Sequence, residues 1–517
     1  MEREICNIVM NTVRSHALMG AICGDIIGLP YEFRGTRTKD FDFDMKFKDF
    51  SDDTILSIAI AQWVMGSDRT ADSLRQLLLD YARRFKDKNV WGRGFMKWVE
   101  SDGTMDRHGV TSNGAVMRVA AIGYASDSLR EVRRLADISA RVSHDSDEAS
   151  LAAQAVASAI LLTRKGLSKD SIMNYVMNWY GYTSYGSNIT HTPEKIRENY
   201  QFEIECHKCV PEAFACWYRS ASYEEAVRNA VSLGGDADTL AAIAGALSAA
   251  TPGMAIPSHI IGCCLSLLPD DFRETLRRFF TQEQWGTTPP DTDSGLTDLG
   301  LSVLWRTANI GASSPELPGT FFAHSETTPK EQYKSSNYRN QKNASAMVYD
   351  VPPMFQDEAT PVCAGYTEYL QGTDTAEALL GKDYRLPLPH EWMELMYCCR
   401  QDYLTINDSP VVRLTAPNGR TLLLPCAKCY NDSSINKKDP NEGYYPSCST
   451  WNSVPGGGGP GADTGPNVVD TLIFARNTYP NMYPCSRHIG MPVRAVKPFE
   501  DAPVSHNGYG RAIDWIH

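Results

Sequence analysis

Two short acidic stretches constrain this chain more than any other feature of its sequence. Residues 51–54 (Ser-Asp-Asp-Thr) and 234–239 (Gly-Gly-Asp-Ala-Asp-Thr) each place two carboxylates and a hydroxyl directly before an apolar stretch with helical spacing. Carboxylates at that position favour a helix N-terminus, where the helix dipole and free N–H groups stabilise negative charge. Either stretch alone indicates a well-capped helix. Both together supply the oxygen ligands that Mg²⁺ or Mn²⁺ prefers and zinc does not.

Length and charge narrow the class of protein. A chain of 517 residues is too long for one ordinary core, so we expect at least two domains. The 42% apolar and 22% charged content is typical of a soluble globular protein. Acidic residues (62) outnumber basic ones (50), and the net charge of −12 argues against general nucleic-acid binding. A phosphate-bearing small ligand held at a local site remains compatible with this charge.

No stretch of the sequence predicts export or insertion into a membrane. The first residues are charged and no apolar stretch is long enough to span a bilayer, so we expect a cytoplasmic protein. In that compartment the 14 cysteines are expected to be thiols. Two pairs have metal-like spacing, Cys206 with Cys209 and Cys426 with Cys429. Because the pairs fall in different predicted domains, buried thiols are favoured over a zinc site.

The chain changes character near residue 285. Up to residue 284 the apolar spacing is helical, which predicts an all-α domain over residues 1–284. Residues 285–345, rich in Ser, Thr, Pro, Gly and Asn, indicate a linker. One short apolar segment near residues 301–305 allows part of this linker to be ordered against a neighbouring domain. Residues 346–517 alternate short β-like stretches with turns, which indicates a small α+β domain. Helices are expected at 55–65, 74–85, 111–118 (at least its start), 129–142, 148–162, 171–180, 211–230, 237–250, 257–281 and 389–399, and strands at 411–414, 421–425, 471–474 and 492–496.

The first domain resembles the ADP-ribosylglycohydrolase family, the group that includes the dinitrogenase-reductase-activating glycohydrolase. The similarity covers about residues 10–283, and each motif is weak alone while the ordered set is specific. The motifs, in family order, are Gly24-Asp25-Ile26-Ile27-Gly28 with Glu32, Ser51-Asp52-Asp53-Thr54, Gly92-Arg93-Gly94, Ser112-Asn113-Gly114-Ala115-Val116-Met117-Arg118, Ser143-His144 and Gly234-Gly235-Asp236-Ala237-Asp238-Thr239.

This resemblance implies an all-α hydrolase that binds two Mg²⁺ ions, with Mn²⁺ as the alternative, in one cleft. The family usually has Thr where this chain has Ser51, and both residues supply a hydroxyl oxygen. The implied substrate is ADP-ribose joined to a protein side chain, and the bond cut is the glycosidic bond at the distal ribose. The implied metal ligands are Ser51, Asp52, Asp53, Asp236, Asp238 and Thr239.

The same resemblance assigns catalytic roles to three carboxylates. Cleavage builds positive charge on the ribose, and a metal-bound water whose proton passes to a carboxylate can attack it. Asp52 and Asp53 are the candidates for ligand and base, and the sequence does not separate the two roles. Glu32 matches the family's mobile glutamate, with a role in positioning or proton transfer. Without the family match, Glu32 would be interpreted as a surface carboxylate.

The remaining motifs are assigned to substrate binding. Backbone N–H groups at glycine-rich turns can hold a diphosphate, although ordinary turn chemistry explains the same residues. Met117 can instead be a core residue and Arg118 a structural ion pair. His144 is a candidate for the adenosine side of the ligand, or a hydrogen-bonded structural residue. The substrate-binding candidates are Gly92, Gly94, Ser112, Asn113, Gly114, Met117 and His144.

The C-terminal part resembles the Fibrobacter major paralogous domain, which has a C-type-lectin-like fold. The middle motif departs from that family, which more often has Trp-Ser-Ser than Pro-Ser-Cys-Ser. The resemblance implies a binding module with a protein partner. The motifs are Arg385-Leu386-Pro387-Leu388-Pro389-His390-Glu391-Trp392, Leu423-Leu424-Pro425, Gly443-Tyr444-Tyr445-Pro446-Ser447-Cys448-Ser449-Thr450 and Val493-Arg494-Ala495-Val496-Lys497.

Three functions therefore compete. The first is a hydrolase that removes ADP-ribose from a modified protein side chain. The second is a hydrolase of a free ADP-ribosyl or nucleotide-like compound. The third is a catalytically silent protein that binds ADP-ribose or a partner. The intact set of Asp52, Asp53, Asp236 and Asp238 argues against silence, since a silent protein could lose these residues without unfolding. The acceptor side chain, the ligand of the C-terminal domain and the oligomeric state are not specified by these motifs.

Overall fold

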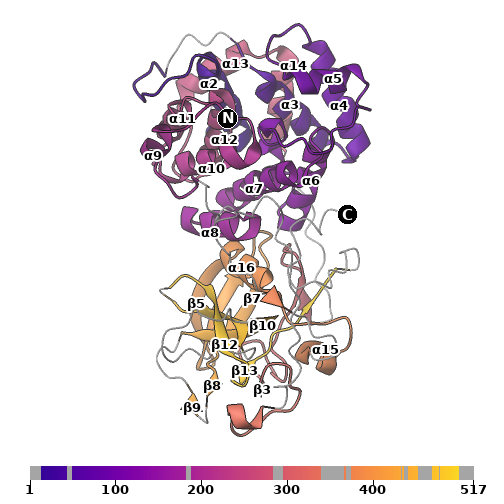
Figure 1. The fold of residues 1–517 in the computed structure, drawn as a ribbon, viewed down its shortest axis with the longest axis vertical. Helices are drawn as coiled ribbons and strands as arrows, with labels where there is room; N and C mark the ends of the chain where they lie inside the picture. The colour runs from indigo at the N-terminus through magenta and orange to yellow at the C-terminus, as the bar shows by residue number, and fades with distance from the viewer. Residues whose placement is uncertain are drawn as a thin grey trace, which may run out of the picture. The chain divides into compact units, whose positions relative to one another are not determined.

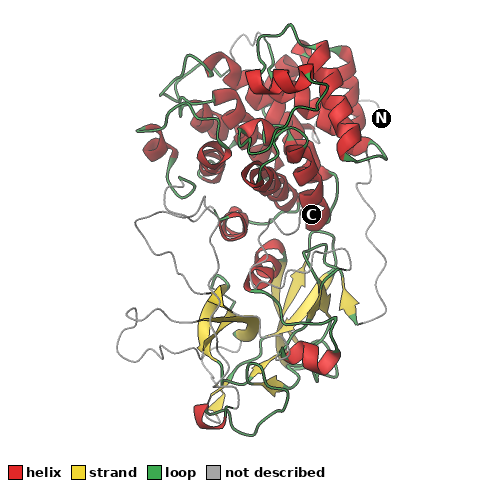
Figure 2. Ribbon diagram, turned by 45° about the vertical axis from the view of Figure 1, so that its right-hand side comes forward, coloured by secondary structure: helices red, strands yellow, loops and turns green. Residues whose placement is uncertain are grey.

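The structure is a computed structural model. It describes residues 13–43, 49–181, 188–282, 295–338, 366–367, 374–431, 434–435, 441–451, 468–476 and 478–499. The chain divides into two units, Met1–Thr288 and Pro289–His517. Among the described residues, the first unit is built of helices and loops and all the strands belong to the second (Figure 2).

The first unit is a helical domain. Its inner helices are buried on all sides, whereas outer helices such as α4 turn one apolar face inward. The α-helices (Figure 1) are α2 (Ala17–Gly28), α3 (Asp52–Met65), α4 (Ala71–Arg84), α5 (Arg93–Glu100), α6 (Leu129–Arg141), α7 (Asp147–Arg164), α8 (Lys169–Tyr180), α9 (Pro193–Arg197), α10 (Cys206–Tyr218), α11 (Tyr223–Val231), α12 (Ala237–Ala250), α13 (Ser258–Leu267) and α14 (Asp270–Phe280), with short 3₁₀ helices η1 (Leu29–Tyr31), η2 (Asn113–Ala115) and η3 (Val119–Tyr124).

Helices α2 and α12 pack against each other with almost no side chain between them. Gly20, Gly24 and Gly28 lie four residues apart and therefore share one face of α2. A Cβ atom at any of the three would overlap the backbone of α12, at Gly245, Ala241 and Ala237 respectively. Every residue of both helices is buried. Small residues thus permit the close approach that forms the centre of the unit.

Three helical stretches differ from the expected pattern. The range 211–230 contains two helices, because α10 ends at Tyr218 and Ser222 caps α11 by accepting the Glu225 N–H at 3.1 Å. The range 257–281 is divided at Pro269, whose ring fits the start of α14 but not the interior of a helix. Residues 113–115 form only a 3₁₀ turn, and the expected α-helix at 111–118 is absent from these described residues.

The second unit is rich in antiparallel strands. The four-stranded sheet has the order β12-β11-β10-β4, and the three-stranded sheets have the orders β5-β6-β7 and β1-β2-β14. The elements are β1 (Leu296–Thr297), β2 (Leu304–Arg306), β3 (Phe321–Phe322), β4 (Tyr366–Thr367), α15 (Thr375–Leu380), α16 (Pro389–Cys398), β5 (Arg400–Ile406), β6 (Ser409–Thr415), β7 (Thr421–Pro425), β8 (Tyr430–Asn431), β9 (Ser434–Ile435), β10 (Gly443–Trp451), β11 (Val468–Phe474), β12 (Asn481–Ser486), β13 (Met491–Pro492) and β14 (Val496–Lys497).

Part of the predicted linker belongs to this second unit. Strand β2 pairs with β14, and β3 pairs with β13. Trp305 of β2 is fully buried, with its ring centroid 4.9 Å from that of Trp392. The composition of residues 285–345 suggested a linker because it is polar. Its few apolar residues are nevertheless the ones that enter the core, so residues 295–338 are structured.

Three of the four motifs of the C-terminal part, at residues 385–392, 443–450 and 493–497, contact one another in this unit. Glu391, which is fully buried, accepts hydrogen bonds from Arg385 and from the Leu388 N–H at the start of α16. Arg385 pairs through its backbone with Val496. The ring of Trp392 lies 5.4 Å from that of Tyr445 in β10. These residues hold helix α16 against the strands.

No helix among the described residues is long and apolar enough to cross a membrane. The location of the protein in the cytoplasm stays a prediction.

The contact between α2 and α12 can be tested by adding one methyl group. We expect Gly24→Ala to lower the free energy of unfolding by about 2 kcal/mol or more, because the new Cβ would overlap the backbone of α12. The measurement is urea unfolding of the whole protein. The matched control is Gly262→Ala in α13, where no atom lies within 4 Å of the added Cβ. There the loss of backbone freedom in the unfolded chain should stabilise the protein by roughly 0.5–1 kcal/mol. Equal effects of the two variants would contradict the close contact.

Candidate active site

Asp25 joins α2 to the first acidic stretch. Its fully buried carboxylate accepts hydrogen bonds from the backbone N–H of Ser51 at 3.1 Å and of Thr54 at 3.2 Å, and from the Thr54 hydroxyl. Burial raises the pKa of Asp25, although these hydrogen bonds oppose the shift. Asp25 belongs to the first sequence motif, which by itself indicates no role for this residue. An acidic residue inside an otherwise apolar helix was the signal for it.

The two acidic stretches come together at helix N-termini, as expected. Asp52 and Asp53 form the first turn of α3, Asp236 precedes α12, and Asp238 lies in its first turn. Glu32 follows η1, and its carboxylate oxygen lies within 4.8 Å of those of Asp236 and Asp238. Asp53, Asp236 and Asp238 are buried, whereas Glu32 and Asp52 are partly exposed. Thr239 donates a long hydrogen bond of 3.4 Å to Asp53.

Burial and mutual repulsion make this cluster unfavourable on its own. Both effects, burial first, raise the pKa of Glu32 to about 8 and that of Asp236 to about 6. They also raise the pKa values of Asp52, Asp53 and Asp238 well above the usual range. One oxygen of Asp53, Oδ2, is buried and has no hydrogen-bond partner among the described residues. An oxygen-only set with an unsatisfied carboxylate oxygen fits a hard divalent cation.

The carboxylates of both acidic stretches and of Glu32 line a cavity whose volume is about 470 Å³. With the exception of Ser51, every candidate residue from the sequence lines it. The Ser51 hydroxyl instead caps α3 by accepting the Asp53 N–H at 3.0 Å. The candidates that line the cavity are Glu32, Asp52, Asp53, Gly92, Gly94, Ser112, Asn113, Gly114, Met117, His144, Asp236, Asp238 and Thr239.

The loop at residues 112–114, which was expected to bind a diphosphate, is hydrogen-bonded to the second acidic stretch. The side-chain amide of Asn113 donates to Asp236 at 2.7 Å, and both residues are buried. A Cβ atom at Gly114 would lie 2.9 Å from His144 Nε2, so the imidazole requires glycine at that position. Burial and the nearby Arg118 lower the pKa of His144, which favours a neutral ring. Its Nδ1 lies 2.9 Å from the Ser143 hydroxyl.

Three arginines without a predicted role in substrate binding, Arg93, Arg107 and Arg118, also line this cavity. Arg107 donates to the Ser143 carbonyl at 2.7 Å, and its Nη1 lies 3.0 Å from the position a Cβ would take at Gly94. Arg93 belongs to the Gly-Arg-Gly motif and is exposed. No sequence motif indicated Arg107. Arg93 and Arg107 together place positive charge beside the glycines of the Gly-Arg-Gly motif.

Arg118 is a buried residue and not a surface cation. It donates to the Ser139 carbonyl and, at 2.8 Å, to the Ser143 hydroxyl. Burial lowers its pKa to about 9, and the charge of Asp52 partly offsets that shift. A structural ion pair was one expected role for Arg118. The structure shows hydrogen bonds to neutral groups instead.

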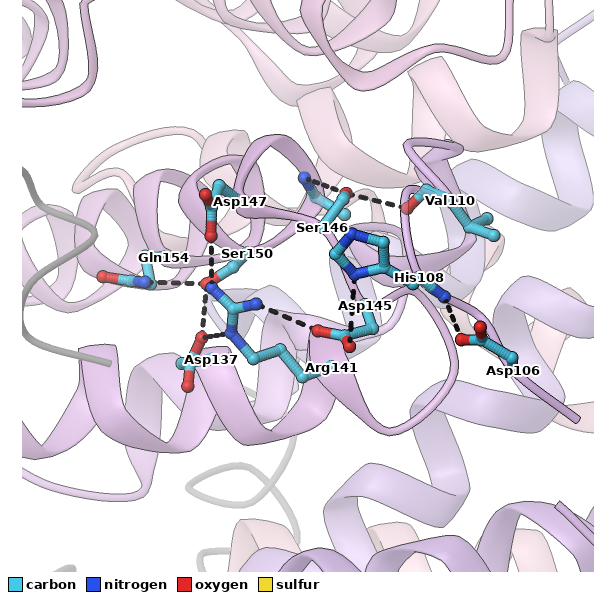
Figure 3. A network of polar contacts seen from close by, with 11 residues as sticks. Asp106, His108, Val110, Asp137, Arg141, Asp145, Ser146, Asp147, Ser150 and Gln154 are labelled. Atoms are coloured by element: carbon cyan, nitrogen blue, oxygen red, sulfur yellow. Dashed lines mark hydrogen bonds and ion pairs between the residues drawn. The ribbon is translucent and has the colours of Figure 1, made fainter. Parts of the chain in front are cut away.

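Arg141 lies at the centre of a network of polar contacts (Figure 3). Its guanidinium contacts three carboxylates, Asp137 at 2.8 Å, Asp145 at 3.0 Å and Asp147 at 2.7 Å. The Asp145 carbonyl accepts the Gly109 N–H at 2.8 Å. The Ser146 hydroxyl donates to the Val110 carbonyl, also at 2.8 Å. Because Gly109 and Val110 line the cavity, Arg141 fixes them through the loop between α6 and α7.

The four cysteines of the two pairs with metal-like spacing lie inside the protein. Cys206, Cys209, Cys426 and Cys429 are all buried. Burial raises the pKa values of Cys206 and Cys209 well above the usual range, so both are protonated. In the described part of the chain, neither pair belongs to a group of three potential metal ligands.

Fold and site define an all-α domain with an acidic, oxygen-lined cleft. The family model described as ADP-ribosylglycohydrolase matches residues 14–288, and this chain belongs to that family. The family resemblance of the first domain is thereby confirmed, and the match ends where the first unit ends. Members of this family are, in general, metal-dependent hydrolases that act on ADP-ribosylated substrates.

Two similar proteins extend this comparison. An uncharacterised protein of Archaeoglobus fulgidus is 29% identical over 279 residues, which cover 47% of this chain and 88% of that protein. A solved structure described as an ADP-ribosylglycohydrolase-related protein complex is 21% identical, with a TM-score of 0.41. That match covers 52% of this chain and 96% of the solved chain.

The Arg141 network predicts a selective loss of ligand affinity. We expect Arg141→Met to weaken ADP-ribose binding about tenfold, because residues 109 and 110 lose the loop that fixes them. The measurement is titration calorimetry with ADP-ribose. Arg134→Met, on the same helix, removes only the exposed pair with Glu131 and should leave the affinity unchanged. Equal affinities of both variants and the wild type would contradict the positioning role.

Proposed function

We propose that this protein is a dinuclear Mg²⁺-dependent hydrolase that cleaves the N- or O-glycosidic bond between ADP-ribose and a modified protein side chain. Family membership supports a glycohydrolase of ADP-ribosyl compounds. The observation that carries the proposal is the convergence of Glu32 and both acidic stretches in one cavity. Five carboxylates kept close together cost stability unless a bound cation compensates them. A protein that only binds ADP-ribose would not need to retain them.

The residues that would hold the two ions are Ser51, Asp52, Asp53, Asp236, Asp238 and Thr239. Capping of α3 does not exclude Ser51, because a hydroxyl oxygen has a second lone pair. Asn113 donates to Asp236 and so orients its carboxylate. When bound, the ions would orient the ribose hydroxyls and lower the pKa of a coordinated water. Mn²⁺ suits the same oxygen set.

The chain's own groups would divide the remaining work. A carboxylate oxygen of Asp52 or Asp53 would take the proton of the attacking water, a contribution of roughly 10²- to 10⁴-fold in rate. Glu32 would position the ribose or transfer a proton. Arg93, Arg107 and the backbone at the glycines would bind the diphosphate. His144, a neutral hydrogen-bonding ring, would face the adenosine side.

A substrate panel tests the proposal. The protein is incubated with peptides that carry ADP-ribosyl-arginine or ADP-ribosyl-serine, with Mg²⁺ and with a chelator in its place. We expect release of ADP-ribose from at least one peptide, and only with the metal. Binding of ADP-ribose without release from either peptide would overturn the proposal and favour a binding protein. Release only from free ADP-ribosyl compounds would favour a small-molecule hydrolase.

The metal assignment is tested by Asp238→Asn. We expect Mg²⁺ affinity and activity to fall roughly a hundredfold or more, because a ligand charge is lost. The stability of the metal-free protein should stay equal or rise, since one of several repelling buried carboxylates is removed. Calorimetric Mg²⁺ titration and thermal unfolding measure the two effects. Asp87→Asn, at an exposed position between α4 and α5, is the matched control. Full activity of Asp238→Asn would refute the assignment.

For the second unit we propose a binding role, as a C-type-lectin-like module that recognises a protein partner. The order of its four motifs supports this, and so does the contact of Trp392 in α16 with Tyr445 in β10. In its described residues no three His, Cys, Asp or Glu side chains meet as metal ligands. The domain bounds of 1–284 and 346–517 stay predictions beside the observed units.

A further inference from the structure

Three apolar side chains gather, exposed, at one rim of the cavity. Phe33 is 82% exposed, Phe202 46% and Ile204 44%. Among the other large apolar residues in the described part of the first unit, Met105 alone is similarly exposed, at 41%. Phe202 and Ile204 line the cavity, and Phe33 directly follows Glu32. Exposed apolar residues that cluster beside a binding site mark a surface that contacts a ligand or partner. We name Phe33, Phe202 and Ile204 the acceptor rim.

The acceptor rim is built from two loops that hold each other in place. Phe33 follows η1, and Phe202 precedes α10, yet their rings stack with centroids 5.9 Å apart and planes 22° apart. Arg37 joins the loops by donating to the carbonyls of Arg197 at 2.9 Å and Tyr200 at 2.6 Å. An aromatic pair that is fixed before binding loses little conformational freedom when a ligand covers it.

The position of the rim indicates which part of a substrate it meets. The Ile204 carbonyl accepts the Asn113 N–H at 2.7 Å, and Asn113 in turn donates to Asp236. Together with Glu32, these contacts place the rim beside the carboxylates. Under the proposed function, the glycosidic bond is cut at those carboxylates. The group that leaves the ribose is therefore the part of the substrate nearest to Phe33.

We infer that the acceptor rim recognises an apolar side chain next to the ADP-ribosylated residue of a polypeptide. This inference rests on the proposed function and narrows its substrate class. A free ADP-ribosyl compound would fill the cavity without covering Phe33, which does not line it. A polypeptide continues beyond the modified residue and can bury the exposed rings.

The test pairs one protein variant with one change in the substrate. Two ADP-ribosylated peptides of equal length carry Leu or Gly beside the modified residue, and a third substrate is the ADP-ribosylated free amino acid. We measure kcat/KM on each for the wild type, for Phe33→Ala and for the double variant with Phe202→Ala. Leu379→Ala, at a 41% exposed position in the second unit, is the control. Calorimetry gives the affinity of each variant for ADP-ribose, and thermal unfolding checks the fold.

We expect the kcat/KM of the wild type to be about tenfold higher on the Leu peptide than on the Gly peptide. Burial of one leucine side chain against the rim can supply a difference of that size. The preference should disappear in the double variant and persist in Leu379→Ala. Loss of the preference without loss of ADP-ribose affinity assigns the rim to the acceptor. A wild type that cleaves both peptides equally would overturn the inference alone. If the variants lose kcat/KM equally on all three substrates, or bind ADP-ribose more weakly, the rim would belong to nucleotide binding. A wild type inactive on every substrate would refute the proposed function, and the inference with it.

Discussion

The close packing of α2 on α12 is the contact on which the site depends. Three glycines spaced four residues apart bring the two backbones together, so the end of α2 that leads to Glu32 lies beside the start of α12 at Asp236 and Asp238. A side chain between the helices would overlap the backbone of α12 and move Glu32 away from Asp236 and Asp238. Asp25, on the same helix α2, holds the first turn of α3. One helix thereby fixes both acidic stretches.

The close packing of several buried carboxylates lowers the stability of the fold and at the same time creates a candidate binding site. Helix N-termini favour negative charge, but the gain near each terminus is only about 0.3–1 kcal/mol for an exposed group. It does not compensate several buried carboxylates that repel one another and have raised pKa values. Arg118 is buried nearby, and its own pKa is lowered to about 9. Under the proposed function a bound cation would offset this cost, which is a reason to interpret the cluster as functional.

The sequence predicted the parts of the site that come from helix ends. Acidic residues before an apolar, helically spaced stretch are a local pattern, and both such stretches lie where they were expected. The helical first unit and the strand-rich second unit were also predictable, because the spacing of apolar residues along the sequence distinguishes helices from strands. Arg107, Arg141 and the stacked Phe33 and Phe202 were not, since their roles depend on contacts between distant loops. The strands within residues 295–338 were not predicted from composition, because a few buried side chains, such as Trp305, outweigh a polar composition.

The loops around the cavity are joined to the same frame that holds the carboxylates. Besides the loop that carries Phe202, Arg37 also binds the Leu233 carbonyl at 2.7 Å. The next residue, Gly234, has a φ of +73°, and a Cβ there would lie 2.9 Å from Arg37 Nε. The turn that delivers Asp236 and the loop that presents Phe202 therefore share one guanidinium. Under the proposed function, recognition of the acceptor and placement of the metal ligands would both depend on Arg37.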